Sequence, residues 1–286
     1  ALTSTQVAAL ETTDVAILSS TQILAIESGD VKALSTSAIA ALTTAQISQF
    51  TSAQFKTLTA DQIAAIETAD IAVLTTAQLS ALVATQGKAL TAEQIAAIPS
   101  ATLSSLSTAA FSNLSVDIIA SLTTAQVSNL STAQVKALTT AQIQALTTTN
   151  IAVLSSSQMA ALTATQGKAL LPEQAAAIES ADIASLAVTT FAGLSVDAIT
   201  AMSSTQIQSL STSQVKALTA TQVPGLEAAD ITALSSTQIG VLTNTQTKVL
   251  SVDQAFAIDS ADIASLSPQA VSGFSADAIG GLAQSQ

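Results

Sequence analysis

The octapeptide TTAQVSNL at residues 123–130 shows the pattern of the whole chain, and TTAQIQAL at residues 139–146 repeats it. Both have Ser or Thr at position 1, Gln at position 4, Ile or Val at position 5 and Leu at position 8. From Thr3 to Leu282 the chain divides into 35 such octads without an insertion or a deletion. We therefore expect residues 1–286 to form a single repeat array, in which AQSQ at residues 283–286 begins one more octad. Residues 1–5 are already in repeat phase, so we expect no signal peptide among them.

The consensus carries a helix start signal in every octad. With position 1 as N-cap and position 4 as N3, the Ser or Thr hydroxyl and the Gln side chain form a capping box. Position 8 of the preceding octad and position 5 then form the apolar pair that packs across a helix start. We expect one short α-helix per octad, with positions 5 and 8 buried and position 6 exposed.

A single continuous helix does not fit this repeat. At about 100° per residue, an apolar stripe repeated every eight residues drifts by roughly 80° per octad, so no face stays buried. A β-solenoid is the alternative, but apolar spacings of three and five are not strict alternation, and Ala, Gln and Leu favour helix. The predicted fold is an all-α solenoid of short capped helices, with the β-solenoid left open.

The charged residues follow the same phase. All seven Lys lie at position 6, and every Asp and Glu lies at position 1, 3 or 4. Acids near helix starts and cations near helix ends both complement the helix dipole. Pro172 and Pro268 occupy position 2, the first helical residue, where proline is tolerated, whereas Pro224 at position 6 removes a helical hydrogen bond.

Composition excludes several functions. The net charge of −12 repels phosphate backbones, and the chain has no Arg to bind them. Nucleic acid is therefore a poor partner. The chain has no Cys and no His, which removes thiolate nucleophiles, imidazole ligands and the commonest general base. Polar residues interrupt every octad, so no segment reaches the about 20 apolar residues of a membrane span. We expect no enzyme activity, no catalytic residue, no cofactor and no transmembrane helix.

Paired acids are the only constellation of chemical interest. Oxygen ligands two or three residues apart can contribute to a Ca²⁺ site, which needs six to eight oxygens. These acids also occupy capping positions, where a helix start already favours negative charge. We therefore predict no obligatory metal at the pairs, which are Glu11/Asp14, Glu27/Asp30, Glu67/Asp70, Glu179/Asp182, Glu227/Asp230 and Asp259/Asp262.

Two further features have structural interpretations. Gly87-Lys88 and Gly167-Lys168 lack the remaining residues of a phosphate-binding loop, and we interpret each glycine as a local thinning of the core. The six Phe lie largely at core positions 5 and 8, and we interpret them as packing residues and not as a ligand-binding cluster: Phe50, Phe55, Phe111, Phe191, Phe256 and Phe274. The Gly-Lys motif and several acids also recur every 80 residues. Duplication of a ten-octad block explains this period better than a superhelical turn of matching length.

The octads resemble LTTAQIAAL-type tracts of very large secreted or surface-associated bacterial proteins, including adhesins. More loosely, the succession of capped helices looks like the superhelical mesothelin and stereocilin proteins, from which no binding residue is carried over. The first resemblance covers essentially the whole chain and implies an extracellular or cell-surface location. The missing Cys is compatible with a secreted bacterial protein.

Two function classes follow. The first is a structural or adhesive segment of a larger extracellular bacterial protein, acting as spacer, filament or surface-layer component. Its partners would be other copies or neighbouring repeats stacked end to end, and components of a cell surface or matrix. The alternative is a module that binds carbohydrate, mineral or ice through rows of Thr, Ser and Gln. Positions 2, 3 and 6 vary in residue type, which favours the structural class.

Overall fold

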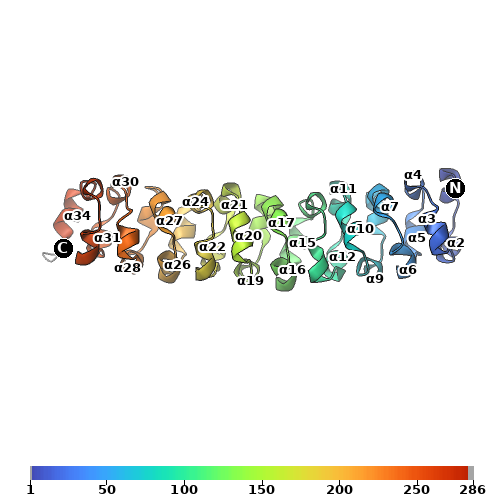
Figure 1. Ribbon diagram of the computed structural model, residues 1–286, viewed down its shortest axis with the longest axis horizontal. Coiled ribbons are helices and arrows are strands. Elements are labelled where there is room, and N and C mark those ends of the chain that lie inside the picture. Colours follow the sequence, from blue (N-terminus) through green and yellow to red (C-terminus); the bar gives the residue numbers. More distant parts are fainter. Residues whose placement is uncertain (1, 283–286) are drawn as a thin grey trace. The chain divides into compact units, whose positions relative to one another are not determined.

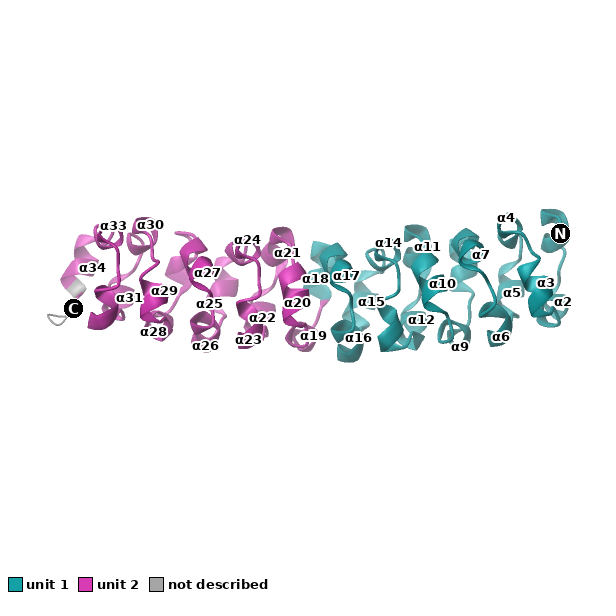
Figure 2. Cartoon of the chain, in the orientation of Figure 1, with its two compact units in different colours: residues 1–145 teal, residues 146–286 magenta. Residues whose placement is uncertain are grey.

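The computed structural model describes residues 2–282 and consists of short helices and their connections (Figure 1). No strand occurs in this part of the chain, so the fold is an all-α repeat solenoid and the β-solenoid alternative is wrong. Residues 283–286, where we expect a further octad to begin, lie outside the described residues. The chain divides into two compact units, whose described parts are residues 2–145 and residues 146–282, and each is considered by itself (Figure 2).

Each of the 35 octads contains one helix, which confirms the prediction from the repeat. Every α-helix begins at position 2 of its octad, with position 1 as N-cap. The helices of the first unit are α1 (Ser4–Ala8), α2 (Thr12–Ala16), α3 (Ser20–Leu24), α4 (Ser28–Val31), α5 (Thr36–Ala40), α6 (Thr44–Ile47), α7 (Ser52–Thr57), α8 (Ala60–Ala64), α9 (Thr68–Ile71), α10 (Thr76–Ala81), α11 (Ala84–Ala89), α12 (Ala92–Ala97), α13 (Ser100–Leu103), α14 (Thr108–Phe111), α15 (Val116–Ser121), α16 (Thr124–Ser128), α17 (Thr132–Ala137) and α18 (Thr140–Ala145).

The second unit continues with the same phase. Its helices are α19 (Thr148–Ala152), α20 (Ser156–Ala161), α21 (Ala164–Ala169), α22 (Pro172–Ala176), α23 (Ser180–Ile183), α24 (Val188–Ala192), α25 (Val196–Thr200), α26 (Ser204–Gln208), α27 (Thr212–Ala217), η1 (Val223–Gly225), α28 (Ala228–Ala233), α29 (Ser236–Ile239), α30 (Asn244–Thr247), α31 (Val252–Phe256), α32 (Ser260–Ile263), α33 (Pro268–Val271) and α34 (Ala276–Gly281).

The capping box sets the start of these helices. At α16 the N–H of Gln126 donates to the hydroxyl of Thr123 (3.2 Å), and the N–H of Thr123 donates to Oε1 of Gln126 (3.1 Å). Two of the N–H groups that a helix start would otherwise leave unpaired thereby gain partners. The chain leaves its helices through ordinary backbone conformations, since no described residue has positive φ. The array therefore needs no glycine at its helix ends.

Pro224 changes the helix type of its octad. Residues 223–225 form the 3-10 helix η1, the only octad of the described chain without an α-helix. Because Pro224 has no N–H, it cannot make the hydrogen bond that an α-helix requires at this point. The N–H of Gly225 instead donates to the carbonyl of Gln222 (2.9 Å). The predicted loss of a helical hydrogen bond is confirmed.

Octads stack on the third and fourth octads along the chain. In the first unit α7 packs on α10 and α11 packs on α14, and in the second unit α22 packs on α25. Side-chain hydrogen bonds also join residues that are 28 or 31 positions apart in the sequence, and these bonds connect an octad to the fourth octad before it. One coil of the solenoid within a unit therefore takes three to four octads. The ten-octad period of the sequence is therefore longer than one coil.

The core follows the predicted positions. Val127 at position 5 and Leu130 at position 8 are 0% and 5% exposed, whereas Lys136 at position 6 lies on the surface. The same pattern holds for most octads of both units. An octad cannot bury its two large aliphatic side chains alone, so stability arises between successive coils, as in other repeat arrays.

Candidate functional site

The glutamine at position 4 has a second role that the capping box does not explain. In α8, Oε1 of Gln62 accepts from the N–H of Thr59 (2.8 Å), as the box requires. Its Nε2 donates to the carbonyls of Val31 (3.0 Å) and Leu34 (2.7 Å), four octads earlier. We call this pair of hydrogen bonds from Nε2, to the carbonyls 31 and 28 residues earlier, the glutamine bridge.

The glutamine bridge recurs in both units. Gln54, Gln78, Gln86 and Gln134 make it in the first unit, and Gln214 repeats it in the second. These side chains are at most 2% exposed. Within residues 2–282 no buried side-chain nitrogen or oxygen lacks a hydrogen-bond partner. The bridge therefore pairs carbonyl groups at the end of one helix with the start of a helix in the next coil.

Sequence reasoning missed the bridge, although the repeat contains a signal for it. A capping box accepts Glu as readily as Gln at N3. Here Gln occupies position 4 in 20 of the 35 octads and Glu in none. A carboxylate accepts hydrogen bonds but cannot donate them, whereas an amide does both. The use of Gln and never of Glu at this position indicates a donor role. The burial of these glutamines also removes them from the exposed surface that a lattice-binding module would need.

The acid pairs lie where the sequence placed them, at helix starts. The carboxylates of Asp14 and Asp230 accept from the N–H groups of Glu11 (3.0 Å) and Glu227 (2.9 Å). Each of these carboxylates thus takes the place of the Gln Oε1 atom, which accepts from the N-cap N–H in the other octads. Asp230 also accepts from the hydroxyl of Ser204 (2.7 Å), 26 residues earlier and one coil away. The same Ser–Asp contact joins Ser4 to Asp30 and Ser156 to Asp182.

The electrostatics of the acids reflect their surroundings. Burial raises the pKa of Asp70, and the nearby carboxylate of Glu67 raises that pKa further. A hydrogen bond from its own backbone N–H lowers the pKa of the exposed Glu93, and the Thr91 hydroxyl lowers that pKa further. Among residues 2–282 no three acidic side chains gather closely enough to hold a metal ion. A pair supplies too few oxygens for the coordination that Ca²⁺ prefers.

The Gly-Lys motifs mark close contacts between coils. A Cβ atom at Gly87 would lie 2.1 Å from the carbonyl oxygen of Ala110, and one at Gly167 would lie 2.5 Å from that of Thr190. The backbone of the third following octad thus occupies the space of the missing side chain. Our interpretation of these glycines as a thinning of the core is wrong: they allow close backbone approach. Since the two contacts are 80 residues apart, they give the long sequence period a structural counterpart.

Five of the six Phe are core residues, as expected. Phe55, Phe111 and Phe191 are fully buried, and the ring of Phe50 meets that of Phe55 edge to face at 6.2 Å. Phe274 is also buried. Phe256 is the exception: it lies at position 6, and 59% of it is exposed. The prediction of a packing role is therefore wrong for Phe256.

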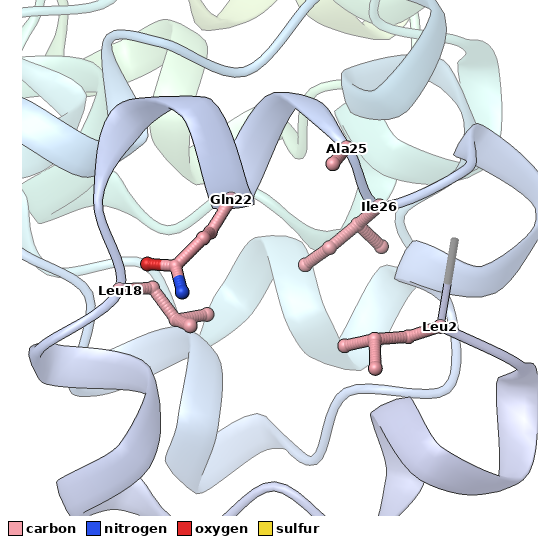
Figure 3. Close-up of a pocket in the computed structure, with 5 residues that line it drawn as sticks. All are labelled: Leu2, Leu18, Gln22, Ala25 and Ile26. Carbon is pink, nitrogen blue, oxygen red and sulfur yellow. The ribbon is translucent and has the colours of Figure 1, made fainter.

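A pocket opens in the first coil of the first unit, around the start and end of α3 (Figure 3). Leu2, Leu18, Gln22, Ala25 and Ile26 line it. In later coils the equivalent position 8 leucines are buried and the equivalent glutamines form bridges to earlier octads. The pocket therefore contains positions that contact neighbouring octads in the later coils of the unit.

The described α-helices have four to six residues, and none of the described helices is long and apolar enough to cross a membrane.

A comparison with curated proteins gave no match. The family described as ALTTAQ repeat matches at residues 23–60, 63–100, 119–148, 175–212 and 199–228, which together cover more than half of the chain. The hexapeptide ALTTAQ itself stands at residues 41–46 and 137–142, across the junction of two octads. The chain therefore belongs to the ALTTAQ repeat family.

Proposed function

We propose that this chain is a structural repeat segment of a larger extracellular bacterial protein, acting as a spacer, filament or surface-layer component, and that it is not an enzyme. The glutamine bridge carries this proposal. Within each unit it joins successive coils through buried hydrogen bonds at a fixed offset. Such repetition suits a segment whose length can vary while its cross-section stays the same.

Association through the stacking surfaces belongs to the same proposal. The pocket around Leu2, Leu18 and Gln22 offers apolar side chains and a glutamine amide in the arrangement that octads use inside each unit. Further octads, from the same polypeptide or from another copy, are its natural partners. A contact of this kind is head to tail, and it propagates into filaments where the rotation does not close.

Electron microscopy and light scattering of the purified chain test the structural role. We expect ordered particles whose mean length grows with protein concentration. Antibody labelling of intact cells that make the parent protein tests the location, and we expect label on the outer surface. Label seen only after the cells are permeabilised would overturn the extracellular proposal, and concentration-independent monomers would overturn the filament proposal.

A further inference from the structure

Two of the four Asn residues stand in the pattern Asn-x-Ser, which is the acceptor pattern for N-linked sugars. They are Asn113 in the tripeptide NLS at residues 113–115 and Asn129 in a second NLS at residues 129–131. Both lie at position 7 of their octads, and no other octad has Asn there. The pattern describes an acceptor only where the Asn lies on a surface loop, so the structure has to supply the context.

Both Asn side chains lie on such loops. Asn113 is in the connection after α14 and Asn129 is in the connection after α16, and both are exposed. Nδ2 of Asn113 donates to the carbonyl of Ala109 (2.9 Å), and Nδ2 of Asn129 donates to the carbonyl of Ala125 (2.8 Å). An Asn amide has two N–H hydrogens, and an N-linked sugar replaces only one of them. Each hydrogen bond can therefore persist after a sugar is attached.

The other two Asn residues are internal controls. Asn150 is buried, with 2% of it exposed, and Ala152 stands two residues after it. Asn244 is exposed, but Gln246 stands two residues after it. Neither has the hydroxyl that the acceptor pattern requires. Asn244 therefore separates the effect of exposure from the effect of the pattern.

A surface hollow of about 410 Å³ lies beside Asn113. Lys88, Ser115 and Thr139 contribute hydrogen-bonding groups to its lining. Its size is within the range of small-molecule sites, so a first sugar on Asn113 has room and partners at the surface. The second unit has a hollow of about 380 Å³ at equivalent octad positions, where Val241 takes the place of Asn113. This second hollow lacks an acceptor.

We propose that Asn113 and Asn129 are acceptor sites for an N-linked glycan. The co-substrate is a hexose or N-acetylhexosamine that is activated as a diphosphate ester. Nδ2 forms a bond to the anomeric carbon and loses one proton, while the bond from that carbon to the diphosphate oxygen breaks and the diphosphate leaves with its electron pair. The sites go beyond the structural role, and they rest on the extracellular location proposed above, because the pattern is read in secreted proteins.

The two sites differ in the state of the Ser hydroxyl. In the second site, Ser131 donates to Oε1 of Gln134 (3.2 Å) and accepts from the N–H of Gln134 (3.2 Å). In the first site, Ser115 accepts from the N–H of Ile118 (3.3 Å), and its octad has no Gln at position 4 to receive the hydroxyl hydrogen. The hydroxyl of the first site is therefore freer to be recognised by an enzyme.

The middle residue of each pattern belongs to the core. Leu114 and Leu130 are 3% and 5% exposed. An enzyme that reads three consecutive residues cannot reach these side chains in the packed coil, so the sugar is added before the octad packs and then stays on the surface. Because the hydroxyl of Ser115 is freer, Asn113 should be modified more completely than Asn129.

The test is peptide mass spectrometry of the whole 286-residue chain, made in the cells that produce the parent protein. We expect a hexose or N-acetylhexosamine on the peptides that contain Asn113 and Asn129, with higher occupancy at Asn113. The peptides that contain Asn150 and Asn244 should carry none. A chain without sugar at Asn113, or with sugar at Asn244, would overturn the proposal.

Substitutions test the pattern itself. Ser115→Ala should remove the sugar from Asn113, and Ser115→Thr should retain it, because the pattern accepts either hydroxyl. Ser115→Ala also weakens the cap of α15, which by itself would expose the connection and raise the occupancy, so the expected loss is not an effect of unfolding. Sugar that persists at Asn113 in Ser115→Ala would contradict the proposal.

Val241→Asn is the matched gain-of-site variant in the second unit. It places the acceptor pattern before Leu242 and Thr243, at the hollow that lacks an acceptor, and we expect it to add one sugar. Failure to add it would contradict the proposal. Antibody labelling tests the location separately: a surface-labelled chain without sugar contradicts only the sites, and a sugar-bearing chain labelled only after permeabilisation contradicts only the location.

Discussion

Two octads of the second unit, residues 203–210 and 227–234, differ in what position 4 can do. In the first, Gln206 accepts from the N–H of Ser203 (2.8 Å) and donates to the carbonyls of Ala175 (3.0 Å) and Ile178 (2.6 Å). In the second, Asp230 accepts from the N–H of Glu227 and from the hydroxyl of Ser204. Both side chains are buried.

The comparison separates two tasks that the consensus combines. Completing the capping box needs only an acceptor at position 4, which Gln and Asp both supply, although helices such as α5 and α15 begin without one. Joining a helix to the fourth octad before it needs a donor, which an ionised Asp lacks. The acidic octads therefore keep the helix but lose the glutamine bridge. In three of them, Asp30, Asp182 and Asp230 accept instead from a serine hydroxyl 26 residues earlier.

Removal of a glutamine bridge should have the largest effect. Gln206→Ala should lower the free energy of unfolding by about 2–4 kcal/mol, because two backbone carbonyls lose their partner and the helix loses part of its cap. Asp230→Ala should cost less, about 1–2 kcal/mol, since no bridge is lost. Denaturant melts of the two variants measure this difference, and equal losses would contradict the separation of tasks.

Gln206→Glu isolates the donor. This variant keeps the side-chain length and the capping acceptor but turns a carboxylate toward the carbonyls of Ala175 and Ile178. It should be at least as destabilised as Gln206→Ala at neutral pH. Stability should recover at low pH, where the protonated carboxyl can donate. A variant as stable as the wild type at pH 7 would show that the bridge is unimportant.

Creation of a bridge should have a smaller effect of opposite sign. Asp230→Gln places an amide within the same offset of the carbonyls of Ile199 and Met202, at the cost of the Ser204 contact. We expect a gain of about 1 kcal/mol in the free energy of unfolding. Hydrogen exchange of α28 should slow at the same time. Faster exchange in this variant would mean that the acidic octad cannot accommodate the amide.

Loss of the Ser–Asp contact should be weaker still. Ser204→Ala removes one hydrogen bond to Asp230, which we expect to cost about 1 kcal/mol. The exposed Ser213, at position 3 of a neighbouring octad, is the control, and Ser213→Ala should change stability by less than about 0.5 kcal/mol. Denaturant melts of both variants under the same conditions measure the difference in unfolding free energy. Indistinguishable curves would show that the Ser–Asp contact does not stabilise the fold.

The helices were predictable because every octad carries its own start signal. The residues of one octad, such as 123–130, suffice to place an N-cap, an N3 glutamine and two buried positions. The neighbours of an octad were not predictable in this way. Since the octads are nearly identical, nothing in one of them indicates whether it packs on the second, third or fourth octad along the chain.

The details missed at the sites have the same physical origin. Glycine is needed at position 87 because the backbone of Ala110 lies against it. The donor role of Gln62 depends on the carbonyls of Val31 and Leu34. Neither contact can be inferred from a local pattern. Phe256 shows the reverse error. Its position 6 phase already indicated exposure, but the general preference of Phe for the core was given more weight.

The smallest expected effect comes from the buried carboxyl of an acidic octad in the first unit. Burial and the charge of Glu67 hold the pKa of Asp70 above its ordinary value. A carboxyl whose pKa is raised on folding favours the folded state most below its ordinary pKa, and this contribution is lost as pH rises through the folded-state pKa. The difference in unfolding free energy between wild type and Asp70→Asn should therefore shift against the wild type as pH increases from about 3 to 7.

Carboxyl chemical shifts should show Asp70 titrating above its ordinary range, and Glu67→Gln should bring the pKa of Asp70 part of the way back. If Asp70 titrated at or below the ordinary pKa of an aspartate, or if the difference moved in favour of the wild type with rising pH, the burial of this carboxyl would not carry the electrostatic cost assigned to it.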